Sequence, residues 1–268
     1  MHVGYVREDN RSLDDIETSP LAHDEINYAW SRHRKGILRT LEDGERVTLR
    51  HTDTDGVVSW VGNAPRESPW LTQRTEIGDL TVPPDGFFQV NDEVAAELAR
   101  QVRGWIAEAL ADGADTILDL YCGVGVFGLA GALAGASRVI GVESVRPAVT
   151  AARRNARALD VASKTHFTAS ACADAAKDGF GNLDFRRAVV VVDPPRAGME
   201  RETAEAIVRG APKTVLYVSC DPATLSRDLA FFHEAGYAIR DARVLDMFPR
   251  TLHFESAIRL GRDAPSDA

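Results

Sequence analysis

Short apolar runs alternate with helix-like segments along the chain from about residue 87 onward. The runs are rich in valine, isoleucine and leucine and lack the alternation of a strand that faces water on one side. They cover residues 116–121, 139–142, 188–192, 215–218, 244–245 and 254–260. Continuous apolar runs of this length are typical of parallel strands that helices bury on both faces. The pattern therefore predicts an α/β domain with a doubly wound parallel sheet.

A helix and a smaller region precede these strands. Asn91 or Asp92 can cap a helix whose apolar positions recur at helical spacing. Residues 1–86 are more polar, and Asp-Gly, Gly-Asn and Pro-Pro turn signals separate short Val/Thr/Trp alternations there. We expect residues 1–86 to form a small, mostly β region and residues 87–268 to form the larger domain.

Composition and charge exclude several classes of protein. The 268-residue chain is 44% hydrophobic and 26% charged, which excludes a disordered or collagen-like chain. Its net charge of −9 argues against nucleic-acid binding by overall charge but leaves a local basic face open. The three cysteines form no C-x-x-C pair, so neither a disulfide framework nor a cysteine metal site is supported, and no metal-binding residue is predicted. Because no targeting signal or membrane-length apolar run is present, we expect a cytoplasmic protein without membrane contact.

Chemically distinctive residues follow the predicted strands directly. In a doubly wound sheet, ligands bind beyond the carboxyl ends of the strands. A glycine turn, Gly123-x-Gly125-x-x-Gly128, follows Tyr121, and Glu143 ends the next strand, where its carboxylate can accept hydrogen bonds from ribose hydroxyls. This arrangement favours an adenosine-containing cofactor. NAD and a purely structural turn are the alternatives, although the rest of the chain offers no constellation for hydride transfer.

Two further strand ends carry groups suited to chemistry on a heterocycle. Asp193 stands at the tip of a buried strand, and the two prolines after it fix the backbone, so its carboxylate could hold a flat ring or simply cap a turn. Cys220 stands between a strand and a helix whose amides favour a thiolate, so we expect its pKa to be lowered. Cys122 and Cys172 are interpreted as inert core residues.

Taken together, these segments resemble the RNA (uracil-5-)-methyltransferase family, whose members form 5-methyluridine in tRNA and ribosomal RNA. The matching motifs are Phe88-Gln89-Val90-Asn91, Asp119 to Gly125, Asp193 to Gly198, Ser219 to Leu225 and Asp246 to Glu255. They follow the family order from about residue 87 to residue 260. A weaker match over residues 4–27 resembles the family's central subdomain. The resemblance implies a Rossmann-like methyltransferase domain at 87–268 and an RNA-contacting partial subdomain at 1–86.

The resemblance also implies S-adenosylmethionine as cofactor and a covalent mechanism on a uridine. Cys220 would add to carbon 6 as the nucleophile, and Glu255 would remove the proton from carbon 5. The cofactor would be bound by Gln89, Tyr121, Gly123, Gly125, Glu143 and Asp193. The target base would contact Phe87, Gln89, Asp193 and Arg196. By resemblance alone, ribosomal RNA is slightly favoured over tRNA as the substrate.

The chain departs from the family pattern at several positions. We expect it to lack the family's N-terminal OB-like domain, and Ser19 takes the place of an iron–sulfur cysteine, so we expect no cluster. Val126 and Asp221 each replace an asparagine, and the Asp221 charge would oppose a thiolate at Cys220. RNA contact would then involve the basic, aromatic-containing stretch at 30–39, which could equally be a solvated helix face.

Two other functions stay open on the sequence. An amino-methyltransferase acting on adenine or a protein amide also uses a carboxylate or amide followed by two prolines. Such enzymes typically place an aromatic residue where Arg196 stands here, and they need no cysteine. A catalytically weak remnant that binds cofactor and RNA would also fit. We expect the chain to act on RNA as a monomer, with modest and salt-sensitive affinity.

Overall fold

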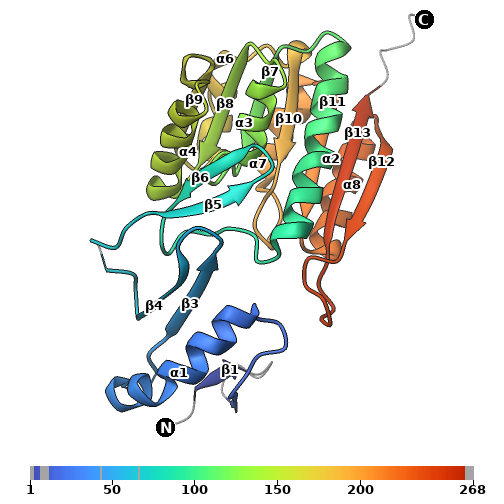
Figure 1. The fold of residues 1–268 in the computed structure, drawn as a ribbon. Coiled ribbons are helices and arrows are strands. Elements are labelled where there is room, and N and C mark those ends of the chain that lie inside the picture. Colours follow the sequence, from blue (N-terminus) through green and yellow to red (C-terminus); the bar gives the residue numbers. More distant parts are fainter. Residues whose placement is uncertain (1–2, 7–11, 43, 66, 263–268) are drawn as a thin grey trace, which may run out of the picture. The chain divides into compact units, whose positions relative to one another are not determined.

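The computed structural model describes residues 3–6, 12–42, 44–65 and 67–262, which fall into two compact units (Figure 1). The first unit comprises Met1–Arg74 and Pro83–Asp85, and the second comprises Thr75–Val82 and Gly86–Ala268. The first boundary falls between Arg74 and Thr75, at the end of strand β5 (Leu71–Thr75), so strand β6 (Gly78–Val82) belongs to the second unit. Each unit therefore has its own packing and is described separately.

The first unit combines two antiparallel strand pairs with one long helix. Strand β1 (Gly4–Val6) pairs with β2 (Leu13–Asp15), and β3 (Val47–Thr52) pairs with β4 (Gly56–Val61). The pair β3–β4 corresponds to the Val/Thr alternations and turns around Gly56, which has a positive φ of 69°. The helix between the two pairs, α1, has no counterpart in those alternations.

Helix α1 (Asp24–Thr40) contains the basic stretch that the sequence singled out. Its apolar anchor is Trp30, which is buried and whose indole donates a 3.2 Å hydrogen bond to the Ile16 carbonyl oxygen. On the same face of the helix, Arg34 lies over the Trp30 ring at 5.8 Å and is paired with Asp15 at 2.6 Å, whereas Arg32, Lys35 and Arg39 are exposed. The stretch is thus a largely solvated helix face with exposed cations, and contact with RNA stays a prediction.

The second unit is built on a seven-stranded sheet with the strand order β12-β13-β11-β10-β7-β8-β9. The parallel strands are β7 (Thr116–Leu120), β8 (Arg138–Glu143), β9 (Thr165–Ala169), β10 (Ala188–Val192) and β11 (Thr214–Ser219). The last two strands, β12 (Tyr237–Leu245) and β13 (Glu255–Arg262), run antiparallel. The predicted doubly wound sheet is confirmed, except that its final pair is antiparallel.

Helices cover both faces of this sheet (Figure 1). One group packs together and contains α2 (Asp92–Ala111), α3 (Val126–Leu133) and α4 (Arg146–Ala158). The other group contains α5 (Cys172–Ala176), α7 (Arg201–Gly210) and α8 (Pro222–Glu234), and the short α6 (Gly179–Asn182) contacts α5. The predicted cap is confirmed, because the Asn91 side chain accepts a 3.3 Å hydrogen bond from the Val94 amide.

The central strands form the core of the second unit. Every residue of β7 and β10 is buried, and the four valines of β10 have no exposed surface. Burying one such side chain contributes roughly 1.5–3 kcal/mol, so these strands fix the sheet on which the loops at its edges are mounted.

Within the described part of the chain, no helix has the length and apolar character needed to cross a bilayer.

Candidate active site

Residues predicted to bind and react are gathered at one edge of the sheet. The parallel strands β7, β8, β10 and β11 end at this edge, and Tyr121, Glu143, Asp193 and Cys220 stand at or just beyond their carboxyl ends. Because β13 runs antiparallel to β11, its first residue, Glu255, comes to the same edge. Five chain segments that are distant in sequence therefore contribute to one candidate site in the second unit.

The register of β11 and β13 brings Cys220 beside Glu255. Ser219 pairs with Ser256 at the end of the ladder, and in an antiparallel pair the next position on β11 lies opposite the preceding position on β13. Glu255 is only 3% exposed, and its Oε2 has no hydrogen-bond partner among the described residues. Burial raises the pKa of Glu255 to about 8, the charge of Asp193 adds to this effect, and Arg196 opposes it.

The Cys220 thiol does not have the lowered pKa that the sequence predicts. Burial raises its pKa, the Glu255 carboxylate raises it further, and Arg196 counteracts both through its charge and a hydrogen bond to the thiol. The free helix amides on which the prediction depended are occupied. Asp221 caps α8 with its Oδ1, which accepts hydrogen bonds of 3.0 and 2.9 Å from the amides of Ala223 and Thr224.

Asp221 therefore has a different role from the one expected. Its carboxylate is turned toward the helix, where the amides lower its own pKa. The carboxylates that raise the pKa of Cys220 are those of Glu255 and Asp193. Cys220, Glu255, Asp193 and Arg196 consequently form one electrostatically coupled group at the edge of the sheet.

This coupling predicts opposite effects of two substitutions on the thiol. Glu255→Gln should lower the pKa of Cys220, because Glu255 is ionised above about pH 8 and then repels the thiolate. Arg196→Gln should raise that pKa, because a cation and a hydrogen-bond donor are lost. The measurement is the rate of iodoacetamide alkylation of Cys220 against pH, with Asp221→Asn as the control that leaves the profile in place. Shifts in the same direction for both variants would contradict the geometry.

The loop that carries Asp193 and Arg196 is anchored by a buried carboxylate, that of Asp228. Asp228 Oδ2 accepts hydrogen bonds from the Met199 amide at 3.0 Å and from the Tyr217 hydroxyl at 2.6 Å. Its neighbour Arg227 donates a 3.1 Å hydrogen bond to the Ala197 carbonyl oxygen. A Cβ at position 198 would approach Asp228 Oδ2 to 2.8 Å, and its φ is +78°, so the turn requires glycine. These contacts hold the turn in one position.

Removing the Asp228 charge should destabilise the second unit. Asp228→Asn turns an amide donor toward groups that are themselves donors, so the free energy of unfolding should fall by about 1–3 kcal/mol. Urea unfolding monitored by tryptophan fluorescence measures this change. The exposed pair of Asp174 with Lys177 provides the control, because Asp174→Asn breaks a surface ion pair worth at most about 1 kcal/mol. Equal losses in the two variants would contradict the anchoring role.

Burial and hydrogen bonds shape the rest of the Asp193 environment. Its amide donates a 3.4 Å hydrogen bond to the Leu120 carbonyl oxygen, which ties the end of β10 to the end of β7. Burial raises the pKa of Asp193 to about 7. The group can therefore exchange a proton near neutral pH and can either accept or donate a hydrogen bond to a bound ring.

The glycine turn after β7 contains backbone conformations with positive φ, which most residues avoid. Gly123 and Gly125 have φ values of +52° and +92°, and Tyr121 also has a positive φ, of 59°. Asn155 of α4 fixes the turn from below, since its Nδ2 donates a 3.2 Å hydrogen bond to the Val124 carbonyl oxygen. Gly125 is buried, and a Cβ there would lie 3.1 Å from the Phe167 ring, so this glycine serves packing, whereas Gly123 is half-buried and is the glycine of the turn that a ligand could approach.

Glu143 is positioned by this same turn. Its Oε2 accepts a 3.1 Å hydrogen bond from the Gly123 amide, and its Oε1 accepts one of 2.7 Å from the Val145 amide. The Ser144 hydroxyl also donates to Oε1 at 3.1 Å, so the carboxylate is fixed at the end of β8 with acceptor capacity remaining on Oε2. The Tyr121 hydroxyl is also engaged, because it donates to Glu200, a residue that the sequence did not single out.

Asp119 is a buried carboxylate beside the glycine turn that the sequence analysis did not name as a candidate site residue. It is fully buried within β7, its Oδ2 accepts a 2.8 Å hydrogen bond from the Gly128 amide, and its Oδ1 has no partner among the described residues. Burial raises its pKa to about 7. The approach is close, since a Cβ at Gly128 would lie 2.9 Å from Asp119 Oδ2. The signal was a lone aspartate inside an otherwise apolar run.

Phe87 and Gln89 lie in the segment before α2. Phe87 is 77% exposed, so it is free to meet a partner but is not part of the buried site. Gln89 Oε1 is buried without a hydrogen-bond partner, as are Asp119 Oδ1 and Glu255 Oε2. These are three of the five such side-chain atoms in the described residues. A buried acceptor without a partner calls for a donor, and a bound ligand with amino and hydroxyl groups would supply one.

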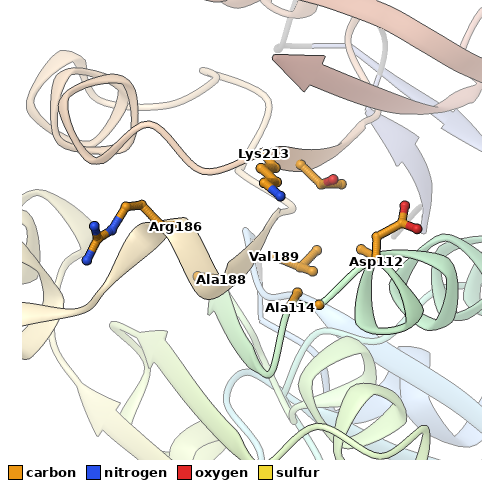
Figure 2. Close-up of a pocket in the computed structure, with 9 residues that line it drawn as sticks. Asp112, Ala114, Arg186, Ala188, Val189 and Lys213 are labelled. Atoms are coloured by element: carbon orange, nitrogen blue, oxygen red, sulfur yellow. The ribbon is translucent and has the colours of Figure 1, made fainter. Parts of the chain in front are cut away.

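A small cavity lies at the other edge of the sheet, away from these residues. Figure 2 shows it between the segment at Asp112 and Ala114 and the residues Arg186, Val189 and Lys213. Its volume is about 70 Å³, which is room for a few water molecules. None of the predicted site residues lines it, so it is separate from the candidate site.

Sequence relatives and a solved structure point to the same group of proteins. The chain is 37% identical over 204 residues to the 23S rRNA (uracil(747)-C(5))-methyltransferase RlmC of Shewanella halifaxensis, covering 74% of this chain and 52% of the relative. It is 38% identical over 193 residues to the 23S rRNA (uracil(1939)-C(5))-methyltransferase RlmD of Shewanella woodyi, covering 72% of this chain and 41% of the relative. The chain spans about half the length of the curated relatives it matches.

The structural similarity extends over most of the chain. The crystal structure of the Pyrococcus abyssi tRNA (uracil-54, C5)-methyltransferase in complex with S-adenosyl-L-homocysteine matches with a TM-score of 0.72 and 26% identity, covering 95% of this chain and 71% of that chain. The model of the tRNA (uracil-5-)-methyltransferase family matches residues 80–263, which is more than half of the chain. The resemblance inferred from the motifs is thereby confirmed, and the chain belongs to the tRNA (uracil-5-)-methyltransferase family.

Proposed function

We propose that the chain transfers a methyl group from S-adenosylmethionine to carbon 5 of a uridine in RNA. The observation that carries this proposal is the placement of Cys220 beside Glu255 by the register of β11 and β13. The names of the matched relatives support it, since they act on carbon 5 of uracil in 23S rRNA or in tRNA. The solved relative contains S-adenosyl-L-homocysteine, which is the cofactor after loss of its methyl group.

The residues around the glycine turn fit this cofactor. The half-buried Gly123 allows close approach to the backbone, Glu143 Oε2 keeps acceptor capacity for a ribose hydroxyl, and Gln89 offers a buried carbonyl oxygen without a partner. The residues that would hold the cofactor are Gln89, Tyr121, Gly123, Gly125, Glu143 and Asp193. When bound, S-adenosylmethionine supplies a methyl group that is reactive toward a carbon nucleophile.

Cys220 prepares the uridine for this reaction. Carbon 5 of uracil is a poor nucleophile until the thiolate adds to carbon 6, which pushes an electron pair into the ring and forms an enolate. Because the pKa of Cys220 is raised, thiolate formation depends on the nearby guanidinium of Arg196, which lowers it. Asp193 lies at the same edge and would orient the base through the ring N–H.

Glu255 completes the reaction after carbon 5 has gained its methyl group. Its carboxylate accepts the proton from carbon 5, the electron pair of that C–H bond restores the ring double bond, and the bond from carbon 6 to Cys220 breaks. A pKa of about 8 makes this carboxylate a stronger base than an exposed one. Burial and the charge of Asp193 raise the pKa of Glu255, and this raised pKa suits proton transfer near neutral pH.

We further propose ribosomal RNA as the substrate, contacted partly by the first unit. The RlmC and RlmD relatives share 37–38% identity with the chain, against 26% for the solved tRNA enzyme. The exposed cations Arg32, Lys35 and Arg39 on α1 are available to phosphates, whereas Arg34 is paired with Asp15. The target uridine would have to leave its stack to reach the buried carboxylate of Glu255.

One assay tests the activity and the substrate together. The chain is incubated with labelled S-adenosylmethionine and with unmodified 23S rRNA or tRNA transcripts, and the labelled nucleoside is identified by mass spectrometry. The expected product is 5-methyluridine in the 23S rRNA. A label on an exocyclic amine would identify an amino-methyltransferase instead. Cofactor and RNA binding by calorimetry without any transfer would identify a binding remnant.

A further inference from the structure

Three side chains with metal-ligating atoms meet in the first unit, outside the candidate active site. His23 directly precedes α1, Glu25 lies in the first turn of that helix, and His51 comes from strand β3. One ligand atom from each residue, a ring nitrogen of each histidine and a carboxylate oxygen of Glu25, lies within 4.8 Å of the other two. Strand β3 and the start of α1 are distant in sequence, so the fold itself creates the cluster.

The contacts within the cluster are specific. The two imidazole rings are stacked, with centroids 4.3 Å apart and planes inclined by 13°. His23 Nδ1 is hydrogen-bonded to the Glu25 carboxylate.

From this geometry we propose that His23, Glu25 and His51 bind a divalent transition-metal cation of the zinc class. Imidazole nitrogen and carboxylate oxygen are the donors that zinc prefers when no thiolate is present. Three protein ligands leave one position of a tetrahedral ion for water. This proposal is independent of the methyltransferase activity, because no residue of the candidate active site takes part.

Exposure of the cluster suits an ion that enters from solvent. The side chains of His23 and Glu25 are 56% and 58% exposed, so rotation about their side-chain bonds can turn the ligand atoms toward a common point without disturbing the core. A surface pair of this kind contributes little stability by itself. A cation bound by His51 of β3 together with His23 and Glu25 would stabilise the folded first unit more than the ion pair alone does.

The same cation would connect the two parts of the first unit. Helix α1 packs against β3 and β4, and His51 stands one residue before the end of β3. A cation held by His51 and by the start of α1 would fix the helix on the strand pair. Since α1 also displays Arg32, Lys35 and Arg39, the cation would set the direction in which these side chains point.

Metal titration of the full chain tests the proposal. The protein, without an affinity tag and stripped with EDTA, is titrated with Zn²⁺ by calorimetry and with Co²⁺ by visible absorption. We expect one saturable site that His51→Ala and Glu25→Gln each weaken by at least about tenfold. Cys220→Ala should leave the affinity unchanged, which separates this site from binding at the thiol.

His33 provides the matched control, because it is an exposed histidine on the same helix. His33→Ala should keep the wild-type affinity. Circular dichroism confirms that each variant is folded, and His23→Gln, at an exposed position, gives a third independent measurement of ligand loss. Wild-type affinity in the folded His51→Ala and Glu25→Gln variants would overturn the proposal, as would the absence of a saturable site in the unmodified chain.

Discussion

Replacing Cys220 by alanine is expected to abolish methylation of RNA, with a fall in kcat of at least about 10³-fold. Without the sulfur, no group at this edge of the sheet can add to carbon 6, and carbon 5 stays unreactive. The structure supports this role because the thiol is coupled to Glu255, Asp193 and Arg196. The measurement is transfer of labelled methyl groups to 23S rRNA under single-turnover conditions.

Cys122 supplies the matched control for this result. It is a buried thiol next to the glycine turn, and burial raises its pKa well above the ordinary value, so it is unsuited to attack. Cys122→Ala should keep turnover within a few-fold of the wild type. If Cys220→Ala were to methylate RNA at the wild-type rate while folded, the covalent mechanism would have to be abandoned.

Replacing Glu255 by glutamine is expected to separate the two halves of the reaction. Cys220 can still add to the ring, but no base removes the proton from carbon 5, so the covalent complex with RNA cannot be released. The turnover rate should fall by about 10²–10⁴-fold, and a protein–RNA adduct should accumulate. Denaturing gel electrophoresis with labelled RNA measures the adduct directly.

Two control variants test whether the accumulated protein–RNA adduct results from the loss of the Glu255 carboxylate. Glu108→Gln removes the exposed carboxylate that pairs with Arg259 of β13, so it perturbs the same strand without touching the site. It should turn over normally and accumulate no adduct. The double variant Cys220→Ala with Glu255→Gln should form none either. Rapid product release by Glu255→Gln would show that another group takes the proton.

The sheet was predictable where burial is uniform. The run at 188–192 is apolar at every position, and it forms β10, which is buried on both faces. Strand β9 was missed because it lies at the edge of the sheet and mixes buried Phe167 with exposed His166. Helix α1 was considered only as a solvated helix face over 30–39, and its full extent was not predicted, because most of its surface is polar and Trp30 is its one buried residue. Elements at the edge of a sheet or on the surface bury too few apolar side chains to produce a recognisable hydrophobic pattern in the sequence.

The candidate site was predictable to the extent that parallel strands share an edge. That rule alone places Glu143, Asp193 and Cys220 together. The position of Glu255 depends on the antiparallel register of β13, which is a long-range pairing that no local pattern encodes. The raised pKa of Cys220 depends on the same pairing, because the carboxylate opposite the thiol offsets what the following helix would provide. Such effects arise only when the fold is complete.

Strand β13 is the last strand that the structure describes, yet it lies between β11 and β12 in the sheet. The order in which the strands are synthesised therefore differs from their order in space. The ribosome delivers the sulfur-bearing turn first and the carboxylate-bearing strand only afterwards. A nascent chain that stalls before residue 255 contains Cys220 but lacks Glu255, the proposed base for the step that releases the methylated RNA. The proposed site is therefore complete only once β13 has been made and has paired with β11 and β12.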